Sequence, residues 1–263
     1  MFSIAIPTWE FHGKGKYFLY DLLESIRDQT LPPSEIIISD HSVNNDIYDM
    51  CQNNYFNLPI KYFRFDKYRG SPSHNLNHAI YQCSKELIKI MFQDDFFDNK
   101  KALETFYHAF GIDTSWVLCG SNLTNHNRSI FYKKMIPMFD RRILLGVNNI
   151  SSPSVLAFKK TKFRGIKFDA SLPMMMDCDF YYHSFLTHGK PKIITQTLVT
   201  NRIHENQLSN NYNGDIKEEI VYTLKKYHSI PCVKLFVLIL MPIIKTGIKI
   251  RSLFLNIINY RFN

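Results

Sequence analysis

The chain has 263 residues, of which 45% are hydrophobic and 14% aromatic, and its formal net charge is +9. This length fits one large domain, or one domain with an appendage, and the composition excludes a disordered chain. The positive charge makes nucleic acid, an anionic membrane surface and phosphorylated substrates the candidate partners.

The five cysteines are scattered along the chain and form no CxxC pair. This usage indicates reduced thiols in a cytosolic setting, and argues against a disulfide framework or a zinc site. The N-terminus shows no signal-peptide pattern, and no apolar stretch reaches the roughly 18–20 residues needed to span a bilayer. We therefore expect a cytoplasmic protein.

The first forty residues alternate between strand and helix patterns. Residues 2–6 form an apolar run that Pro7 ends, which predicts a buried strand. Apolar residues recur at helical spacing from 17 to 29, and residues 35–39 predict a second strand with Asp40 at its carboxyl end. Strand, helix and apolar strand in succession predict a parallel sheet of the α/β class.

A strand is also predicted at residues 60–65, and a helix from about residue 76 to residue 85. Gly70, Ser71, Pro72 and Ser73 lead into this helix. Such a helix start offers backbone N–H groups and the positive end of a helix dipole, which would suit a diphosphate. An ordinary helix N-cap has the same sequence, so both interpretations stay open.

Two adjacent carboxylates, Asp94 and Asp95, follow an apolar, β-branched run at residues 88–92 that predicts a buried strand. Two acids this close repel each other unless a cation or hydrogen-bond donors lie between them. Oxygen ligands on a short turn suit Mg²⁺ or Mn²⁺, which is usually shared with a substrate phosphate. The alternative is a solvated turn in which Asp94 caps a helix beginning near Phe96.

The carboxyl ends of the predicted strands bring these polar groups together. In open parallel sheets, ligands bind outside the carboxyl ends of the strands. Residues 8–10, Asp40 and the acid pair would therefore lie along one edge of the sheet. Each group alone is compatible with an ordinary turn, but the three together predict a binding site.

The second half of the chain continues the α/β pattern. We predict a helix at residues 100–110 and strands at 116–120, 155–158 and 193–200, and interpret the polar region 122–149 as an acceptor-side insertion. Asp177 would lie in the first turn of another helix. An acid there is either a simple helix cap or a carboxylate directed at the sheet edge.

Segments spread over residues 2–210 resemble, in order and spacing, family-2 glycosyltransferases of the GT-A fold, of the type that builds bacterial surface glycans. The resemblance implies an α/β GT-A domain at 1–215, with a nucleotide-binding half at 1–100 and an acceptor-side half at 101–215. Residues 216–263 would then form a C-terminal helical appendage. The matching segments are Ile4–Thr8, Leu22–Thr30, Glu35–Asp40, Gly70–Asn75, Asp94–Asp95, Ser152–Ser154, Met176–Asp179 and His204–Ser209.

The resemblance also implies an inverting transfer of a sugar from a nucleotide-sugar donor to a hydroxyl. A UDP-sugar is the favoured donor, and the acceptor would be a glycan or a lipid-linked glycan. Such a reaction needs a carboxylate base for the incoming hydroxyl and charge stabilisation for the leaving diphosphate, but no covalent intermediate.

Specific roles follow from the matched positions. Asp94 and Asp95 match the last two acids of the family's DxDD pattern: Asp94 would face the ribose or the metal, and Asp95 would bind Mn²⁺ or Mg²⁺. Asp177 matches the general base, and His204 a position near the diphosphate or the metal. The donor-binding positions are Thr8, Glu10 and Asp40 for the base and ribose, together with Gly70, Ser71 and Asn75.

The sequence departs from the family pattern at three positions. Phe92 stands where the first acid of the DxDD pattern is often found, and Met176 replaces the glutamate before the catalytic aspartate. His74 stands where many relatives have arginine. Asp179 is a possible alternative base, although two residues further along a helix it would point elsewhere.

The C-terminal region carries no acidic residue after Glu219, while lysines and arginines alternate with apolar residues. We predict that residues 231–263 form interfacial helices on an anionic cytoplasmic leaflet. The alternatives are a helix packed on the core or a dimer interface.

Three functions compete at this stage. The first is a metal-dependent glycosyltransferase at the inner face of the cytoplasmic membrane, and the second is a catalytically idle GT-A-like domain that binds a nucleotide or acts as a scaffold there. Nucleic-acid binding is not expected, because the basic residues do not gather around an aromatic platform or a helix-turn-helix pattern. The oligomeric state stays open.

Overall fold

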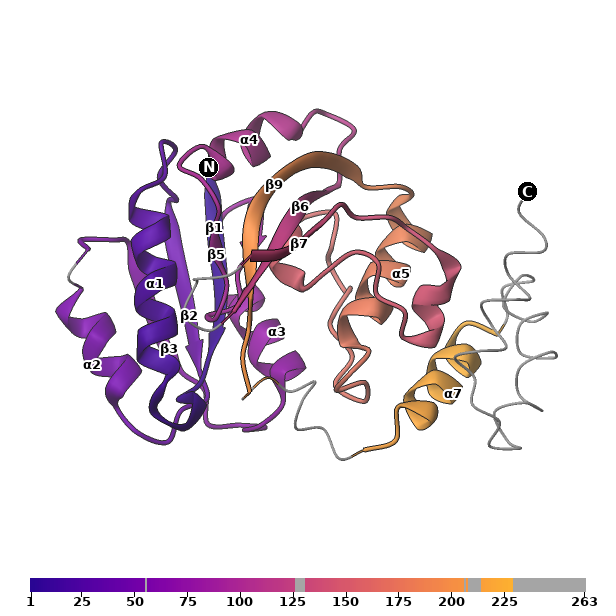
Figure 1. The fold of residues 1–263 in the computed structure, drawn as a ribbon, viewed down its shortest axis with the longest axis horizontal. Helices are drawn as coiled ribbons and strands as arrows, with labels where there is room; N and C mark the ends of the chain where they lie inside the picture. The colour runs from indigo at the N-terminus through magenta and orange to yellow at the C-terminus, as the bar shows by residue number, and fades with distance from the viewer. Residues whose placement is uncertain (55, 126–130, 206, 208–213, 229–263) are drawn as a thin grey trace.

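The computed structural model describes residues 1–228 apart from 55, 126–130, 206 and 208–213. In this part of the chain one nine-stranded sheet runs in the order β3-β2-β1-β4-β8-β6-β9-β5, and β7 pairs with β6. Helices flank the sheet (Figure 1). The strands are β1 (Phe2–Thr8), β2 (Glu35–Asp40), β3 (Ile60–Arg64), β4 (Leu87–Ile90), β5 (Phe96–Phe97), β6 (Trp116–Asn125), β7 (Phe131–Met135), β8 (Leu156–Lys159) and β9 (Lys192–Ile203).

The helices alternate with the strands, as the α/β prediction requires. Three short 3-10 helices lie in loops that border the sheet edge: η1 (Phe11–Gly13), η2 (Arg141–Leu145) and η3 (Pro153–Val155). The α-helices are α1 (Gly15–Arg27), α2 (Asp46–Asn53), α3 (Pro72–Gln82), α4 (Ala102–Ala109), α5 (Met176–His188) and α7 (Ile216–Lys226).

The N-terminal half forms the predicted parallel sheet. β1 lies between β2 and β4, and β3 pairs with β2, all in parallel. β1 and β2 are buried along their whole length, as expected for apolar runs covered on both faces. In this register Thr8 lies beside Asp40, so the polar ends of neighbouring strands meet at one edge.

The second half adds antiparallel strands to the same sheet. β8 is antiparallel to β4 and β6, while β9 runs parallel to β6. Residues 122–125 continue β6 and pair with β7, so part of the region expected to be an insertion belongs to the sheet.

Two local expectations differ from the structure. Residues 96–97 form the short strand β5, which pairs with β9, so no helix begins near Phe96. Helix α3 begins at Pro72 instead of residue 76. The side chain of Ser71 accepts a hydrogen bond from the His74 N–H, and proline at the first helical position has its φ already fixed.

Helix α7 is held against α5 and the loop before it by an ionic cluster around the buried Asp179. The Nζ of Lys226 donates to Asp169 Oδ2 at 2.8 Å and to Asp179 Oδ2 at 2.9 Å. Asp179 is fully buried, and its other oxygen accepts from the hydroxyl of Tyr227 at 2.9 Å. Asp179 therefore faces α7 and points elsewhere than Asp177, as its place two residues further along the helix predicted.

A second contact joins α7 to the start of α5. The buried carboxylate of Glu219 accepts hydrogen bonds from the backbone N–H groups of Met174, at 3.0 Å, and Met175, at 2.9 Å. These N–H groups immediately precede α5, where a helix leaves such donors unsatisfied. Glu219 thus completes the N-terminus of α5 from another helix.

None of the helices in the described residues has the length and apolar character that crossing a membrane requires. The predicted membrane-binding segment, residues 231–263, lies outside the described residues.

Candidate active site

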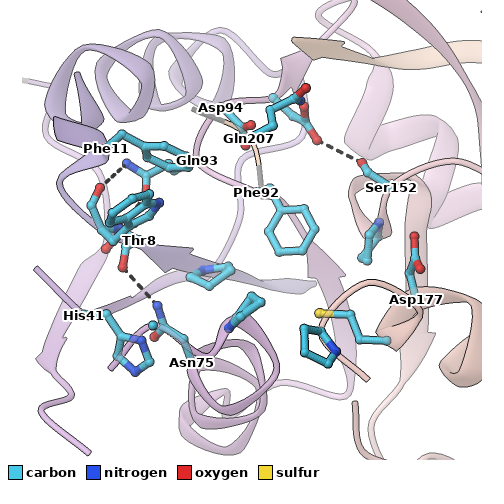
Figure 2. A pocket seen from close by; sticks show the side chains of 18 of the residues that line it. Thr8, Phe11, His41, Asn75, Phe92, Gln93, Asp94, Ser152, Asp177 and Gln207 are labelled. Carbon is cyan, nitrogen blue, oxygen red and sulfur yellow. Dashed lines mark hydrogen bonds between the residues drawn. The ribbon is translucent and has the colours of Figure 1, made fainter. Parts of the chain in front are cut away.

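A cavity of about 530 Å³ lies where the carboxyl ends of β1 and β4 meet the start of α3 and the start of α5 (Figure 2). Six of the ten predicted site residues line it. They are Thr8, Gly70, Asn75, Asp94, Asp95 and Asp177. Four segments far apart in the sequence therefore converge on one space, and two of them, at Thr8 and at the acid pair, are strand ends that the strand-edge argument predicted.

The loop after β1 forms one wall of this cavity, and Gln93 holds it in place. Gln93 Oε1 accepts from the backbone N of Trp9 at 2.6 Å, and its Nε2 donates to the carbonyls of Trp9 and Gly15, both at 3.0 Å. Gly15 is needed here because a Cβ at this position would lie 2.2 Å from the Trp9 carbonyl oxygen. The side chain before the acid pair thus fixes the loop that faces it.

Asp95 is buried and surrounded by hydrogen-bond donors. Its Oδ2 accepts from Ser152 Oγ at 3.0 Å and Asn201 Nδ2 at 2.8 Å, and its Oδ1 accepts from the backbone N of Arg202 at 3.2 Å. Burial, and then the neighbouring charge of Asp94, raise the pKa of Asp95 well above its usual range. A cation beside Asp94 and Asp95 would favour the ionised form of Asp95.

Asp94 lies between the cavity and His204. The His204 Nε2 is 3.0 Å from Asp94 Oδ2, and the His204 ring packs against the rings of Phe11 and Phe18, with centroids 5.3 and 4.7 Å away. His204 is not among the residues that line the cavity, so the structure places it behind Asp94.

The acid pair fits a divalent ion that is bound largely by its substrate. Among the described residues, no cluster of three or more His, Cys, Asp or Glu side chains is arranged to hold a metal ion. Mg²⁺, however, is commonly held by one or two carboxylates together with substrate phosphates. Asp94 and Asp95 supply two carboxylates at the cavity wall, and their mutual repulsion is what such a cation would relieve.

Asp177 also lines the cavity, in the first turn of α5, on the side away from Thr8 and Phe11 (Figure 2). Its Oδ1 accepts from the backbone N of Cys178 at 2.7 Å, and its Oδ2 accepts from Asn148 Nδ2 at 2.6 Å. Desolvation raises the pKa of Asp177 to about 6, although these hydrogen bonds oppose the shift. The carboxyl is therefore ionised at neutral pH and is a stronger base than an ordinary aspartate.

Three further predicted residues are not brought to the cavity. Asp40 is fully buried: its Oδ1 accepts from Thr8 Oγ1 at 3.1 Å and Ser42 Oγ at 2.6 Å, and its Oδ2 accepts from the Tyr62 hydroxyl at 2.7 Å. The carboxylate of Glu10 accepts from the backbone N of Val43 at 3.1 Å.

Ser71, the third of them, caps helix α3, and its hydroxyl lies 2.9 Å from His74 Nδ1. The helix-cap interpretation therefore describes the Ser71 side chain, while Gly70 beside it lines the cavity.

Sequence reasoning missed four polar side chains of this site: His41, Gln93, Asn148 and Asn201. Gln93 and His41 are adjacent to predicted site residues, so position along the chain was the available signal. Asn148 and Asn201 reach the acids only through contacts 29 and 106 residues apart in the chain, which no local pattern predicts.

Comparison with solved structures places the chain among glycosyltransferase folds. S. aureus TarS residues 1–349 in complex with UDP-GlcNAc superpose with a TM-score of 0.62 over 87% of this chain and 73% of that one, at 17% identity. The complex with UDP gives a TM-score of 0.60 over 90% of this chain and 74% of that one, also at 17% identity. A longer TarS structure gives 0.61 at 16% identity, with 87% of this chain covering 44% of that chain.

The profile described as Glycosyl transferase family 2 matches residues 3–172, and the chain belongs to this family. It is also 29% identical, over 117 residues, to a GalNAc(5)-diNAcBac-PP-undecaprenol beta-1,3-glucosyltransferase of Campylobacter jejuni. That match covers 41% of this chain and 37% of the relative, so the chain matches little more than a third of the relative's length. The predicted family is therefore confirmed.

Proposed function

We propose that this glycosyltransferase transfers a sugar from a UDP-sugar to a hydroxyl of a glycan or lipid-linked glycan acceptor, with inversion at the anomeric carbon. The observation that carries the proposal is that Asp177 lines the same cavity as Asp94 and Asp95. The C. jejuni relative, whose name specifies an undecaprenol-linked substrate, supports a lipid-linked acceptor, and the TarS complexes with UDP and UDP-GlcNAc support the donor.

Asp177 acts as the general base in this proposal. Its carboxylate takes the proton of the acceptor hydroxyl while that oxygen forms a bond to the anomeric carbon of the donor sugar. The bond from this carbon to the diphosphate oxygen breaks on the opposite face, and the electron pair leaves with the nucleoside diphosphate. Because attack and departure occur on opposite faces, the anomeric configuration inverts and no covalent intermediate forms.

Asp94 and Asp95 would hold Mg²⁺ or Mn²⁺ against the diphosphate of the donor. When bound, a divalent ion neutralises charge that develops on the leaving diphosphate. Ser152 and Asn201 fix the orientation of the Asp95 carboxylate, and the loop held by Gln93 covers the donor side. The protein itself therefore supplies positioning and a hydrogen-bonded surface for the charge.

Peripheral attachment to the inner face of the cytoplasmic membrane is part of the same proposal. It rests on the basic, apolar segment 231–263 and on the lipid-linked substrate in the relative's name. A liposome flotation assay with and without anionic lipid tests it.

A thermal-shift screen of nucleoside diphosphates, with and without Mn²⁺, tests the donor site. UDP with Mn²⁺ should raise the melting temperature of the wild type, since a ligand that binds only the native state stabilises it by mass action. Asp95→Asn should remove the dependence on Mn²⁺, while Asp113→Asn, on an exposed loop, serves as the matched control. No shift with any nucleoside diphosphate would favour an idle domain.

Transfer itself is followed by release of UDP from UDP-sugars in the presence of candidate glycan acceptors. Asp177→Asn should keep the thermal shift with UDP and lose transfer by about 100-fold or more, in line with the contribution of a general base. Equal transfer by Asp177→Asn and the wild type would remove Asp177 from the mechanism.

A further inference from the structure

Two buried hydrogen-bond acceptors at one corner of the cavity have no partner in the part of the chain that the structure describes. They are His41 Nε2 and Asn75 Oδ1, in side chains that are 6% and 4% exposed. Both residues line the cavity, in the corner that Figure 2 shows beside Thr8. A buried polar atom without a partner is costly, so this corner is suited to a ligand that brings hydrogen-bond donors.

The carbonyl of Thr8 fixes the position of both side chains. It accepts from the backbone N of His41 at 2.9 Å and from Asn75 Nδ2 at 3.0 Å. Because the amide nitrogen of Asn75 is used in this way, its oxygen is the atom left for a ligand.

The surroundings of His41 set which ring nitrogen can accept a hydrogen bond. The backbone of Lys67 raises the pKa of the His41 ring, as a carbonyl facing a ring N–H does, and Nε2 has no partner in the described residues. With the proton of the neutral ring placed on Nδ1, the ring presents a lone pair at Nε2. Burial lowers the pKa of His41, which keeps the ring neutral.

The His41 ring is also fixed in orientation. It stacks on Phe65 at a centroid distance of 5.3 Å, and Phe65 stacks in turn on His78 at 4.1 Å. Asp40, the neighbouring acid at the end of β2, is not available for the same task, because both its oxygens accept from buried protein donors. Of these two neighbours at the end of β2, His41 is therefore the one that lines the cavity.

We propose that His41 Nε2 accepts a hydrogen bond from the imide N3–H of a uracil base, and so selects uridine over cytidine nucleotides. This inference rests on the proposed function and names the residue that reads the donor base. Uracil presents an N–H at position 3, whereas cytosine presents a lone pair there, which would face the lone pair of Nε2. Asn75 Oδ1 is a second acceptor at the same corner, available to a hydroxyl of the same nucleoside.

Binding of UDP, CDP, GDP and N3-methyl-UDP to the purified protein, measured by calorimetry with Mn²⁺, tests the assignment. Wild type should bind UDP about tenfold more tightly than the other three nucleotides, because each lacks the imide N–H or places it in a larger base. His41→Ala should weaken UDP about three- to tenfold and bring UDP, CDP and N3-methyl-UDP to similar affinities. His108→Ala, an exposed histidine on α4, should bind as the wild type does.

Three results would overturn the proposal. If the wild type binds UDP and N3-methyl-UDP equally, or prefers GDP, His41 does not recognise the imide N–H. This measurement uses only the wild type, so it stands even if His41→Ala fails to fold. A folded His41→Ala that keeps the full preference for UDP over CDP assigns the selection elsewhere. If no nucleotide binds, the proposed function falls as well, whereas UDP binding and sugar transfer without base selection refute only the role of His41.

Discussion

The hydrogen bond from Asn148 to Asp177 should set the pH at which the enzyme loses activity. Asn148 Nδ2 lies 2.6 Å from Asp177 Oδ2 and stabilises the ionised carboxylate, whose pKa burial raises to about 6. A hydrogen bond to a charged group contributes about 1.5–3 kcal/mol, and one pKa unit corresponds to about 1.36 kcal/mol. Water in the cavity can replace part of this bond, so we take the lower end, about one unit.

Asn148→Ala should therefore raise the pKa of Asp177 from about 6 to about 7. The base must be ionised, so activity is lost as the pH falls through this pKa. The variant should be roughly twofold slower at pH 7 and roughly eightfold slower at pH 5.5, with little change above pH 8. The assay is kcat/KM against pH, supported by a carbon-13 NMR titration of the Asp177 carboxyl.

Asn148→Asp separates the hydrogen bond from the loop that carries it. Asn148 Oδ1 also accepts from the backbone N–H groups of Ile150 and Ser151, and an aspartate keeps these acceptors. It loses the donor and adds a like charge beside Asp177, so it should raise the pKa of Asp177 at least as far as Asn148→Ala does. The pH below which kcat/KM falls, which we call the acid limb, should rise with it. If Asn148→Ala leaves the acid limb in place, or if Asn148→Asp behaves like the wild type, the reasoning is refuted.

Three further predictions concern stability. Asp177→Asn should raise the free energy of unfolding by about 1–3 kcal/mol above pH 6, because the buried carboxylate has a raised pKa in the folded state. This gain should disappear below about pH 4, where the carboxyl is protonated in both states; urea unfolding at pH 4 and pH 8 checks the sign. Gly15→Ala should cost about 1–3 kcal/mol in urea unfolding because its Cβ would clash with the Trp9 carbonyl. Gly111→Ala should cost little, because its Cβ would lie 3.8 Å from Thr114 Oγ1. Lys226→Met should cost about 3 kcal/mol by leaving Asp179 buried without its cation, and adding Asp179→Asn should recover most of the loss in a double-mutant cycle; additive losses would contradict the pairing.

The parallel sheet of the first strands and the edge where their polar ends meet could be predicted from the sequence, because both follow from short-range patterns. The apolar runs that became β1, β2 and β4 each end in polar residues, and parallel pairing places such ends together. The role of Asp177 as a candidate base came from the resemblance to a family. Hydrophobic periodicity alone could not distinguish such a base from an acid that only caps a helix.

The rest depends on contacts between distant segments. Asp40 has the residue type and position of a ligand-binding acid, but Tyr62 and Ser42 occupy its oxygens, and only the folded chain shows that His41 faces the cavity instead. The region 122–149 lacks a clear period because β6 and β7 form an irregular hairpin whose register shifts near Leu123. A one-residue shift of this kind removes the alternation that strand prediction requires.

Helix α7 supports the first turn of α5, which carries Asp177. It contributes no residue to the cavity wall, yet Glu219 holds the N–H groups of Met174 and Met175 and Lys226 neutralises Asp179, on either side of Asp177. A chain that stopped before residue 216 would keep every residue that lines the cavity and lose the contacts of α7 with the first turn of α5, which carries Asp177. The part of the chain that supports the cavity therefore extends beyond the last residue that lines it.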